Sequence, residues 1–282
     1  MEPIFHIAEA SAWDSAAKSG EYRISTRGRD LDEVGFIHCS HRHQVERVAN
    51  LAYRDAGPLV LLKIDPGRLS SVEVREEAAD GVETFPHIYG ALPAEAVVDV
   101  GPFGPQPGGL FVPPISWLSP KLEVRPSPIE GLGLFAVAGI DEGEPVSVMG
   151  GRVLTDEEFA AHISGADRWS AAAVDEDLNV LQADDDPLSR GNHSCDPNLW
   201  MSDEVTLAAR RTIRVGEEAT VDYALMTVDE GWSMACRCAT SNCRASITGS
   251  DWQRADLQAR YGGHFSPFIQ RRIESGIAQR PA

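Results

Sequence analysis

Four cysteines in the last third of the chain have the spacing of a metal site. Cys195 lies within the polar turn Asn192–Asn198 (NHSCDPN), and Cys236, Cys238 and Cys243 follow it as a C-x-C-x4-C segment. Thiolates bind zinc well, and a tetrahedral set of four sulfur ligands favours zinc over harder metals. Such a site has no open coordination position, so we expect a structural zinc that holds the C-terminal segment in place. The alternative is a group of four reduced cysteines without a metal.

Two further segments contain residue types suited to binding a ligand and transferring a chemical group. Residues Glu130–Ala136 (EGLGLFA) predict a glycine-flanked entry to a strand, where a ligand can approach the backbone because glycine has no Cβ. Residues Gly216–Tyr223 (GEEATVDY) predict a turn that leads into a strand ending at a tyrosine. Each segment alone has an ordinary interpretation, a turn or a core aromatic residue, so only their combination is informative.

In order and combination, these segments resemble the SET-domain protein-lysine methyltransferases with a post-SET zinc segment. The resemblance covers about Leu122 to Ile247. It implies a fold of small β-sheets in which the NHSC segment passes through a loop to form a pseudoknot, and S-adenosylmethionine as the methyl donor. It also implies that Tyr223 is catalytic, with a hydroxyl that orients the lysine amine and stabilises the methyl-sulfonium end of the donor. It places Asn192 and His193 at the donor pocket, and the glycine-flanked backbone of Gly131, Leu132 and Gly133 can approach the same donor closely.

Two places in the chain depart from the family pattern. Ser189-Arg190-Gly191 stands before NHSC, where the family often has arginine, phenylalanine and an apolar residue, and Met149 stands where a tyrosine commonly precedes a glycine. An alternative function therefore stays open. In it, the second half is a zinc-stabilised SET-like module that binds a peptide or S-adenosylmethionine without turnover.

Three histidines in the first half lie in short apolar segments: His6 in IFHI, His38 in GFIHCS and His87 in FPHIYG. Histidine is the commonest general acid–base group and a frequent metal ligand, so three histidines on predicted strands could meet in one cleft with Tyr89. Each of them taken alone also reads as a core histidine. Together the segments resemble a bacterial family of unknown function that is similar to the ADP-ribosyltransferase-like folds. Those folds bind NAD between two small sheets, so a nucleotide- or NAD-dependent activity is a third alternative.

The chain pattern predicts an α+β protein of two domains. Residues Gly101–Pro114 contain nine glycines or prolines among fourteen residues, which break both helix and strand. We therefore expect a first domain at 1–100, a linker at 101–116 and a second domain at 117–282. The expected helices are Ala10–Ser19, His41–Tyr53, a helix capped by Thr155, Asp251–Tyr261 and Pro267–Glu274. The expected strands are Pro3–Ile7, Gly35–Ser40, Leu59–Ile64, Val97–Val100, Leu132–Ala138, Val146–Met149, Ser170–Val174, Val205–Ala209 and Ala219–Tyr223.

Charge and composition narrow the classes of partner and compartment. The 282 residues include 43 acidic and 25 basic side chains, a formal charge of -18 that repels nucleic acid and attracts a basic, lysine-presenting protein substrate. The same charge also has a simpler interpretation, that it serves solubility alone. No apolar run has membrane-spanning length, and the first residues lack a signal-peptide pattern. Five cysteines, an odd number, argue against a disulfide scaffold, so we expect a cytoplasmic protein.

Overall fold

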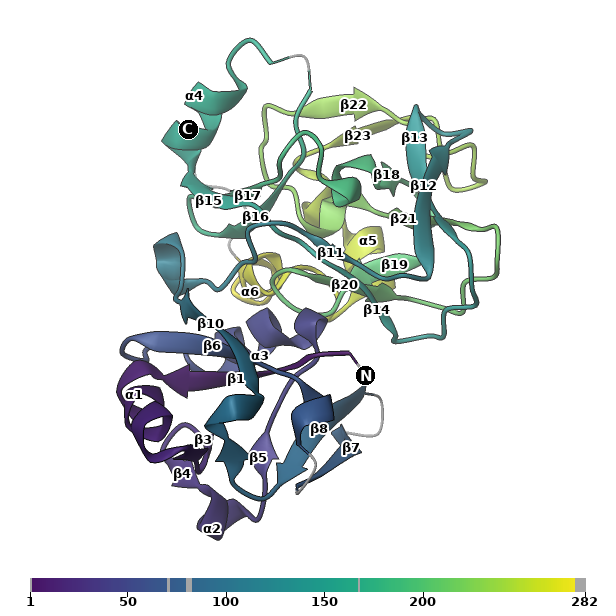
Figure 1. The fold of residues 1–282 in the computed structure, drawn as a ribbon. Coiled ribbons are helices and arrows are strands. Elements are labelled where there is room, and N and C mark those ends of the chain that lie inside the picture. Colours follow the sequence, from purple (N-terminus) through teal and green to yellow (C-terminus); the bar gives the residue numbers. More distant parts are fainter. Residues whose placement is uncertain (1, 70–71, 80–82, 167, 277–282) are drawn as a thin grey trace. The chain divides into compact units, whose positions relative to one another are not determined.

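The computed structural model describes residues 2–69, 72–79, 83–166 and 168–276 (Figure 1). They form two compact units, Met1–Phe111 and Val112–Ala282. Each unit combines short helices with small sheets, as expected for an α+β protein. Within the described ranges, no helix is both long enough and apolar enough to cross a bilayer.

The first unit contains two three-stranded antiparallel sheets, ordered β1-β6-β10 and β5-β8-β7. The first sheet comprises β1 (Ile4–Glu9), β6 (Leu59–Ile64) and β10 (Val97–Phe103). The second comprises β5 (Ile37–His38), β7 (Glu73–Ala79) and β8 (Glu83–Tyr89). Two short pairs complete the strands: β2 (Glu21–Tyr22) with β9 (Leu92–Pro93), and β3 (Ile24–Thr26) with β4 (Arg29–Asp30). The helices are α1 (Ala10–Ser19), α2 (Leu31–Val34) and α3 (Val45–Ala52).

One hydrophobic cluster joins the two sheets of this unit. It contains Leu62 and Ile64 of β6 together with Ile37 of β5 and Ile88 of β8, all with no exposed side-chain surface. Burial of such apolar surface is the main favourable term in folding. The expected helix Ala10–Ser19 is confirmed, and Gly20 ends it in the left-handed conformation with φ 91°. The expected helix His41–Tyr53 begins later, because Arg42–Gln44 form a separate 3-10 turn before α3.

The segment expected to be a linker is instead part of the first unit as far as Phe111. Strand β10 continues through Phe103 and pairs with β6 along that length. Phe111 is 1% exposed, and both its backbone groups bond the side chain of Asn50, at 2.9 and 2.8 Å. Proline and glycine were read as breakers, but Pro102 lies on an edge strand, which tolerates proline. The boundary between the units lies at 111/112 rather than at 100.

The described residues of the second unit form four small sheets. One has the order β11-β14-β20-β19, formed by Trp117–Leu118, Pro145–Val148, Thr206–Ala209 and Leu199–Met201. Another has the order β12-β13-β21-β18, formed by Leu122–Pro126, Leu132–Ala136, Glu218–Val221 and Asn192–His193. The third has the order β15-β17-β16, formed by Arg152–Thr155, Leu178–Leu181 and Ala171–Asp175. A pair of β22 (Ser233–Ala235) and β23 (Ser246–Thr248) completes the set.

Three helices belong to the second unit: α4 (Asp156–Ile163), α5 (Ala255–Tyr261) and α6 (Pro267–Glu274). The expected helix cap at Thr155 is confirmed, with a reciprocal capping box to Glu158. Helix α6 has the expected bounds. The expected helix Asp251–Tyr261 is split, because Arg254 has extended backbone angles between a 3-10 turn and α5.

The parallel pairing of β18 with β21 positions the site. It sets Asn192 opposite Thr220 and His193 opposite Val221, so two motifs that are distant in sequence lie side by side. The strand expected to end at Tyr223 ends at Val221 instead. The Asp222 side chain accepts the backbone N–H of Ala224 and starts a 3-10 turn that contains Tyr223. The turn directs the tyrosine away from the sheet ladder.

We expect a fragment of residues 1–111 to unfold in one cooperative thermal transition, measured by circular dichroism. A fragment of residues 1–100 should be markedly less stable, because it loses the end of β10 and buried Phe111. Removing one buried phenylalanine side chain typically costs about 3–5 kcal/mol. Equal stability of the two fragments would contradict the placement of residues 101–111 in this unit.

Candidate functional site

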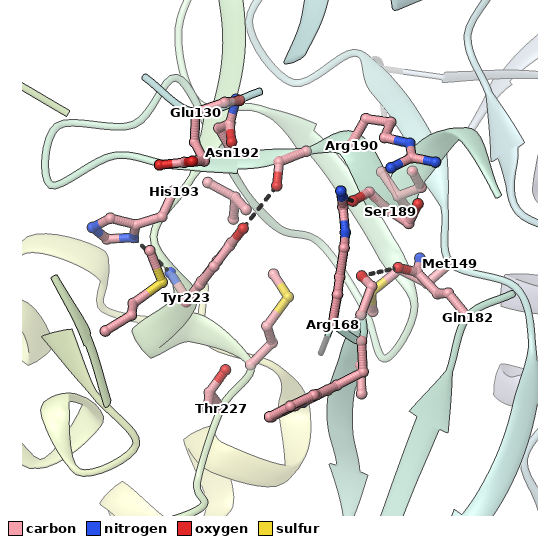
Figure 2. A pocket seen from close by; sticks show the side chains of 18 of the residues that line it. Glu130, Met149, Arg168, Gln182, Ser189, Arg190, Asn192, His193, Tyr223 and Thr227 are labelled. Atoms are coloured by element: carbon pink, nitrogen blue, oxygen red, sulfur yellow. Dashed lines mark hydrogen bonds between the residues drawn. The ribbon is translucent and has the colours of Figure 1, made fainter. Parts of the chain in front are cut away.

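A cavity of about 520 Å³ lies in the second unit, within the size range of small-molecule sites (Figure 2). Its walls come from segments that are far apart in sequence. The turn before β13, strand β16, the strap Leu188–His193 and the segments around Tyr223 and Trp232 all contribute. Figure 2 shows Tyr223 between Asn192 on one side and Arg168 on the other. The cavity thus unites the polar turn, the glycine turn and the tyrosine that the sequence singled out.

Tyr223 is held at both ends. Its hydroxyl donates to the carbonyl oxygen of Gly191 at 2.8 Å, and its backbone N–H donates to Nδ1 of His193 at 3.2 Å. Burial raises the pKa of Tyr223 to about 12, so the phenol stays protonated at neutral pH. A neutral phenol fixed in this way can orient a group in the cavity but does not act as a base.

The tautomer of His193 follows from its contacts. Because the Tyr223 N–H can only donate, Nδ1 accepts, and the ring proton resides on Nε2. That Nε2 lies 3.3 Å from Sγ of Cys195, so the ring donates a hydrogen bond to the cysteine sulfur. Burial lowers the pKa of His193 to about 4, which keeps the ring neutral. His193 therefore connects the cysteine group to the backbone of the candidate catalytic tyrosine.

Asn192 lies in the cavity wall, and its amide nitrogen is used within the protein. It donates to the carbonyl oxygens of Glu130 and Leu132, at 3.2 and 3.0 Å, and to the Glu218 carboxylate at 2.7 Å. Asn192 thus holds the glycine turn that lines the cavity. The role in donor binding that the sequence predicts for Asn192 would act through this turn.

The two glycines of this turn have different surroundings. Gly131 and Leu132 line the cavity, and Gly131 has φ 47°, in the left-handed region that favours glycine. Gly133 does not line it, and a Cβ at that position would overlap the Glu218 carboxylate. The sequence predicts both glycines at the donor pocket. Gly133 instead makes room for the Glu218 carboxylate, which also accepts a hydrogen bond from the Ser127 hydroxyl at 2.9 Å.

The four predicted cysteines come together. Their Sγ atoms all lie within 4.8 Å of one another, and those of Cys195 and Cys236 are 3.7 Å apart. A zinc tetrahedron with bonds of about 2.3 Å has edges of roughly 3.8 Å, so this spacing suits a metal and is far too long for a disulfide. Burial raises the pKa of Cys195 and of Cys236, whereas for Cys238 hydrogen bonds from Thr240 and the Cys195 N–H outweigh burial and lower the pKa to about 6. A thiolate is the form that binds a metal.

The segment that contains the last three cysteines also reaches the buried carboxylate next to the tyrosine. Both oxygens of Asp222 accept from the Arg244 guanidinium at 2.7 Å, and the Tyr261 hydroxyl of α5 donates to the same carboxylate at 3.1 Å. Asp222 is fully buried. The Arg237 guanidinium pairs with Glu130 and that of Arg244 with Asp222, while the backbone N–H of Arg244 donates to Sγ of Cys195 at 3.3 Å.

Sequence reasoning missed three residues that line the cavity: Arg168, Trp169 and Trp232. Arg168 donates to the carbonyl oxygen of Ser189 at 3.2 Å, and Trp169 remains 39% exposed despite its size. The sequence signal that could have identified the two tryptophans is their position in polar segments, where no hydrophobic core requires a large aromatic residue. Both departures from the family pattern also lie at the cavity. Met149 lines it, and Gly191 supplies the carbonyl oxygen that binds Tyr223.

The four candidate residues of the first unit separate into two groups. His6 is 3% exposed and both its ring nitrogens are engaged, by the backbone oxygen of His38 at 2.7 Å and the Tyr22 hydroxyl at 3.0 Å. That pattern is typical of a core histidine. His38, His87 and Tyr89 instead lie together on one face of the sheet β5-β8-β7, considered further below.

We expect about one equivalent of zinc per purified chain by elemental analysis. Cys238→Ser should lower the zinc content and increase proteolysis of the C-terminal segment, because it removes one of four ligands. Cys39→Ala is the matched control, since Cys39 is buried in the first unit outside the group. Full zinc occupancy after replacement of two of the four cysteines would rule out this site.

We expect Asp222→Asn to destabilise the second unit by about 3–5 kcal/mol, because it leaves the Arg244 guanidinium buried without its main countercharge. The control is Arg254→Gln in the exposed pair with Asp256, where a loss of at most about 1 kcal/mol is expected. Urea unfolding can be followed by tryptophan fluorescence, because of the six tryptophans only Trp13 lies in the first unit. Equal effects of both changes would contradict the role of the buried pair.

Comparison with known proteins agrees with this geometry. Residues 131–224 match the model of the SET domain, and residues 7–100 match the model described as a protein of unknown function, DUF952. Curated relatives include the Histone-lysine N-methyltransferase, H3 lysine-4 specific, of Schizosaccharomyces pombe, 30% identical over 140 residues (45% of this chain, 15% of that protein). Histone-lysine N-methyltransferase SUV39H1-A of Danio rerio is 35% identical over 82 residues (25% of this chain, 20% of that protein). The chain thus spans a fifth or less of the length of these two relatives.

Two solved structures are similar to parts of the chain. Protein CC0527 from Caulobacter crescentus is 28% identical, with a TM-score of 0.35, over 39% of this chain and 92% of that chain. The methyltransferase domain of human Histone-lysine N-methyltransferase SETMAR is 23% identical, with a TM-score of 0.39, over 44% of this chain and 56% of that chain. The family models identify the parts: this chain contains a SET domain at residues 131–224, preceded at residues 7–100 by a domain of the family of unknown function.

Proposed function

We propose that the second unit transfers a methyl group from S-adenosylmethionine to lysine side chains of a protein. The observation that carries this proposal is the position of Tyr223. Its phenol enters the cavity beside the strap of the NHSC motif, within the part of the chain that matches the SET domain. The relatives named above are histone-lysine methyltransferases, which supports the same reaction class.

The cavity suits the methyl donor in size and chemistry. Its volume of about 520 Å³ is in the range that holds a molecule of this size. Gly131, Leu132, Asn192 and His193 line one part of it, where their backbone groups can bind the polar ends of the donor. The donor supplies a methyl group on a positively charged sulfur. Tyr223 and Trp232 present aromatic rings to the same space, and such rings attract cations.

The contribution of the protein to methyl transfer is alignment. Transfer requires the lysine amine, the methyl carbon and the sulfur in line, and orientation of bound groups is worth several orders of magnitude in rate. The Tyr223 phenol, fixed by Gly191 and by the backbone bond to His193, can direct one oxygen at the reacting centre without reorganising. Because the phenol stays neutral, it does not provide the base, and the lysine has to enter as the free amine.

We propose that the cysteine group is a post-SET-type zinc site and that the protein works in a reducing, cytoplasmic compartment. The four-sulfur spacing supports the first point and the five unpaired thiols support the second. The net charge of -18 favours a basic protein segment as substrate rather than nucleic acid. For the first unit we propose an ADP-ribosyltransferase-like fold, supported by its two small three-stranded sheets.

The alternative is a SET-like module that binds the donor or a peptide without turnover. Calorimetric titration of the zinc-loaded protein with S-adenosylmethionine tests the enzyme first, because absence of binding excludes an S-adenosylmethionine-dependent enzyme. Binding without transfer of radiolabel to any protein in a mixed pool of lysine-rich and cellular proteins favours the module.

We expect Tyr223→Phe to lower kcat for methyl transfer by about a hundredfold, by analogy with loss of one oriented polar group in an active site. Binding of S-adenosylmethionine should change little, because the ring and its packing remain. Asn192→Ala should have the opposite pattern and weaken donor binding first, because it releases the glycine turn. The assay uses radiolabelled donor on a substrate that the wild type methylates. Wild-type rates for Tyr223→Phe would remove this residue from catalysis.

A further inference from the structure

The sheet β5-β8-β7 of the first unit has two unlike faces. Ile37 of β5 pairs with Ile88 of β8, which pairs with Val74 of β7, and these side chains pack in the core cluster. On the opposite face, His38 pairs directly with His87. The second face of such a sheet normally carries ordinary polar residues. Imidazole and aromatic rings there serve no core, so they call for another explanation.

The two imidazoles face each other, each with one nitrogen already fixed. Nδ1 of His38 lies 3.1 Å from the hydroxyl of the fully buried Ser25, and Nδ1 of His87 lies 3.1 Å from the Glu77 carboxylate. The other Glu77 oxygen accepts the Tyr89 hydroxyl at 2.5 Å, which holds the carboxylate in place. A carboxylate accepts, so Nδ1 of His87 carries the proton and Nε2 carries the lone pair. A hydroxyl can accept from Nδ1 of His38 in the same way.

This arrangement is the one that metal-binding histidines adopt. A ligating histidine nearly always donates its second ring N–H to a carboxylate or another oxygen, which sets the tautomer and the ring orientation. When Nδ1 of His38 donates to the Ser25 hydroxyl, the lone pair of the neutral ring lies on Nε2 and is free for a metal. Phe36 stacks on His87 with ring centroids 4.2 Å apart and restricts its rotation.

The separation of the two rings fits a shared ion. With metal–nitrogen bonds of about 2.0–2.1 Å, each ring centroid lies roughly 3.2 Å from the metal. Two such rings at a tetrahedral angle have centroids about 5.2 Å apart by the same geometry. The centroids of His38 and His87 are 5.2 Å apart, with ring planes at 79°. The separation of the rings is therefore that of two imidazoles bound to one ion through Nε2.

We propose that His38 and His87 bind a divalent transition-metal ion, such as zinc or nickel, with Glu77 as the carboxylate that orients His87. The site is separate from the cysteine group. Among the described residues, the compact groups of three or more ligand atoms include only the four cysteines, so this ion takes its remaining ligands from water or a small bound molecule. Open positions are a feature of catalytic rather than structural metal sites.

The experiment uses the full chain without a histidine tag, saturated with zinc and then dialysed against metal-free buffer. This treatment leaves zinc in the closed four-cysteine group and removes it from the two-histidine site, which has open positions. Calorimetric titration with Ni²⁺ should show one further equivalent. His38→Ala and His87→Ala should each abolish it, and Glu77→Gln should weaken it tenfold or more, as loss of an orienting carboxylate does. With Cu²⁺ in place of Ni²⁺, the electron paramagnetic resonance spectrum should show coupling to two nitrogens, and this two-nitrogen signal should be absent in either histidine variant.

A second histidine pair provides the matched control. His41 and His43 lie nearby, with parallel rings 6.0 Å apart, and bond Glu76 and Glu83 rather than Glu77. The double change His41→Ala, His43→Ala should leave the titration unchanged. Should His87→Ala unfold the unit, His38→Ala remains informative, because His38 is exposed and its removal leaves no buried cavity. Absence of a second equivalent in the wild type, retention of it in His38→Ala, or its loss in the control would each overturn the site.

Discussion

The fold of the second unit depends on one buried carboxylate having its ion-pair and hydrogen-bond partners. The carboxylate of Asp222 has no access to solvent, and a carboxylate in that position costs several kcal/mol unless it is paired and hydrogen-bonded. Its partners come from three places: Arg244 of the cysteine segment, Tyr261 of α5 and the backbone of its own turn. The end of β21, the cysteine segment and α5 therefore have to come together before any of them is stable.

This requirement connects the candidate metal site to the candidate catalytic residue. Cys195 belongs to the polar turn, and its sulfur accepts from the ring of His193, whose other nitrogen holds the Tyr223 backbone. A second connection runs from the cysteine segment through Arg244 to Asp222, the residue before that tyrosine. Methyl transfer depends on alignment, for which small displacements are costly. A metal held by the four cysteines would be too enclosed to react with a substrate, but it would affect the proposed methyl transfer by fixing where the tyrosine lies.

The two units offer metals different chemistry. Four thiolates surround an ion completely and bind it as part of the fold, whereas two imidazoles leave positions for water and an exogenous ligand. The difference follows from the elements that hold the ligands. The four cysteines come from the polar turn and from the segment between β22 and β23, which together bring their sulfur atoms close to one another. The two histidines lie on paired strands, on one open face of a sheet. We therefore infer a structural role for the first site and a binding or catalytic role for the second.

The sequence by itself determined the cysteine group, the tyrosine and the positions of the longer helices and of several strands, because these depend on local spacing. Helices Ala10–Ser19 and Pro267–Glu274 and strand Leu59–Ile64 have the predicted bounds. The tertiary structure decided the rest. Residues 101–111 have the composition of a linker, yet their partners in β6 and at Asn50 lie tens of residues away. Gly133 and Gly131 are alike in sequence, and only the position of Glu218 separates their roles. Pairings between distant residues, such as Asp222 with Arg244, leave no periodicity in a single sequence, because they are set by the fold as a whole.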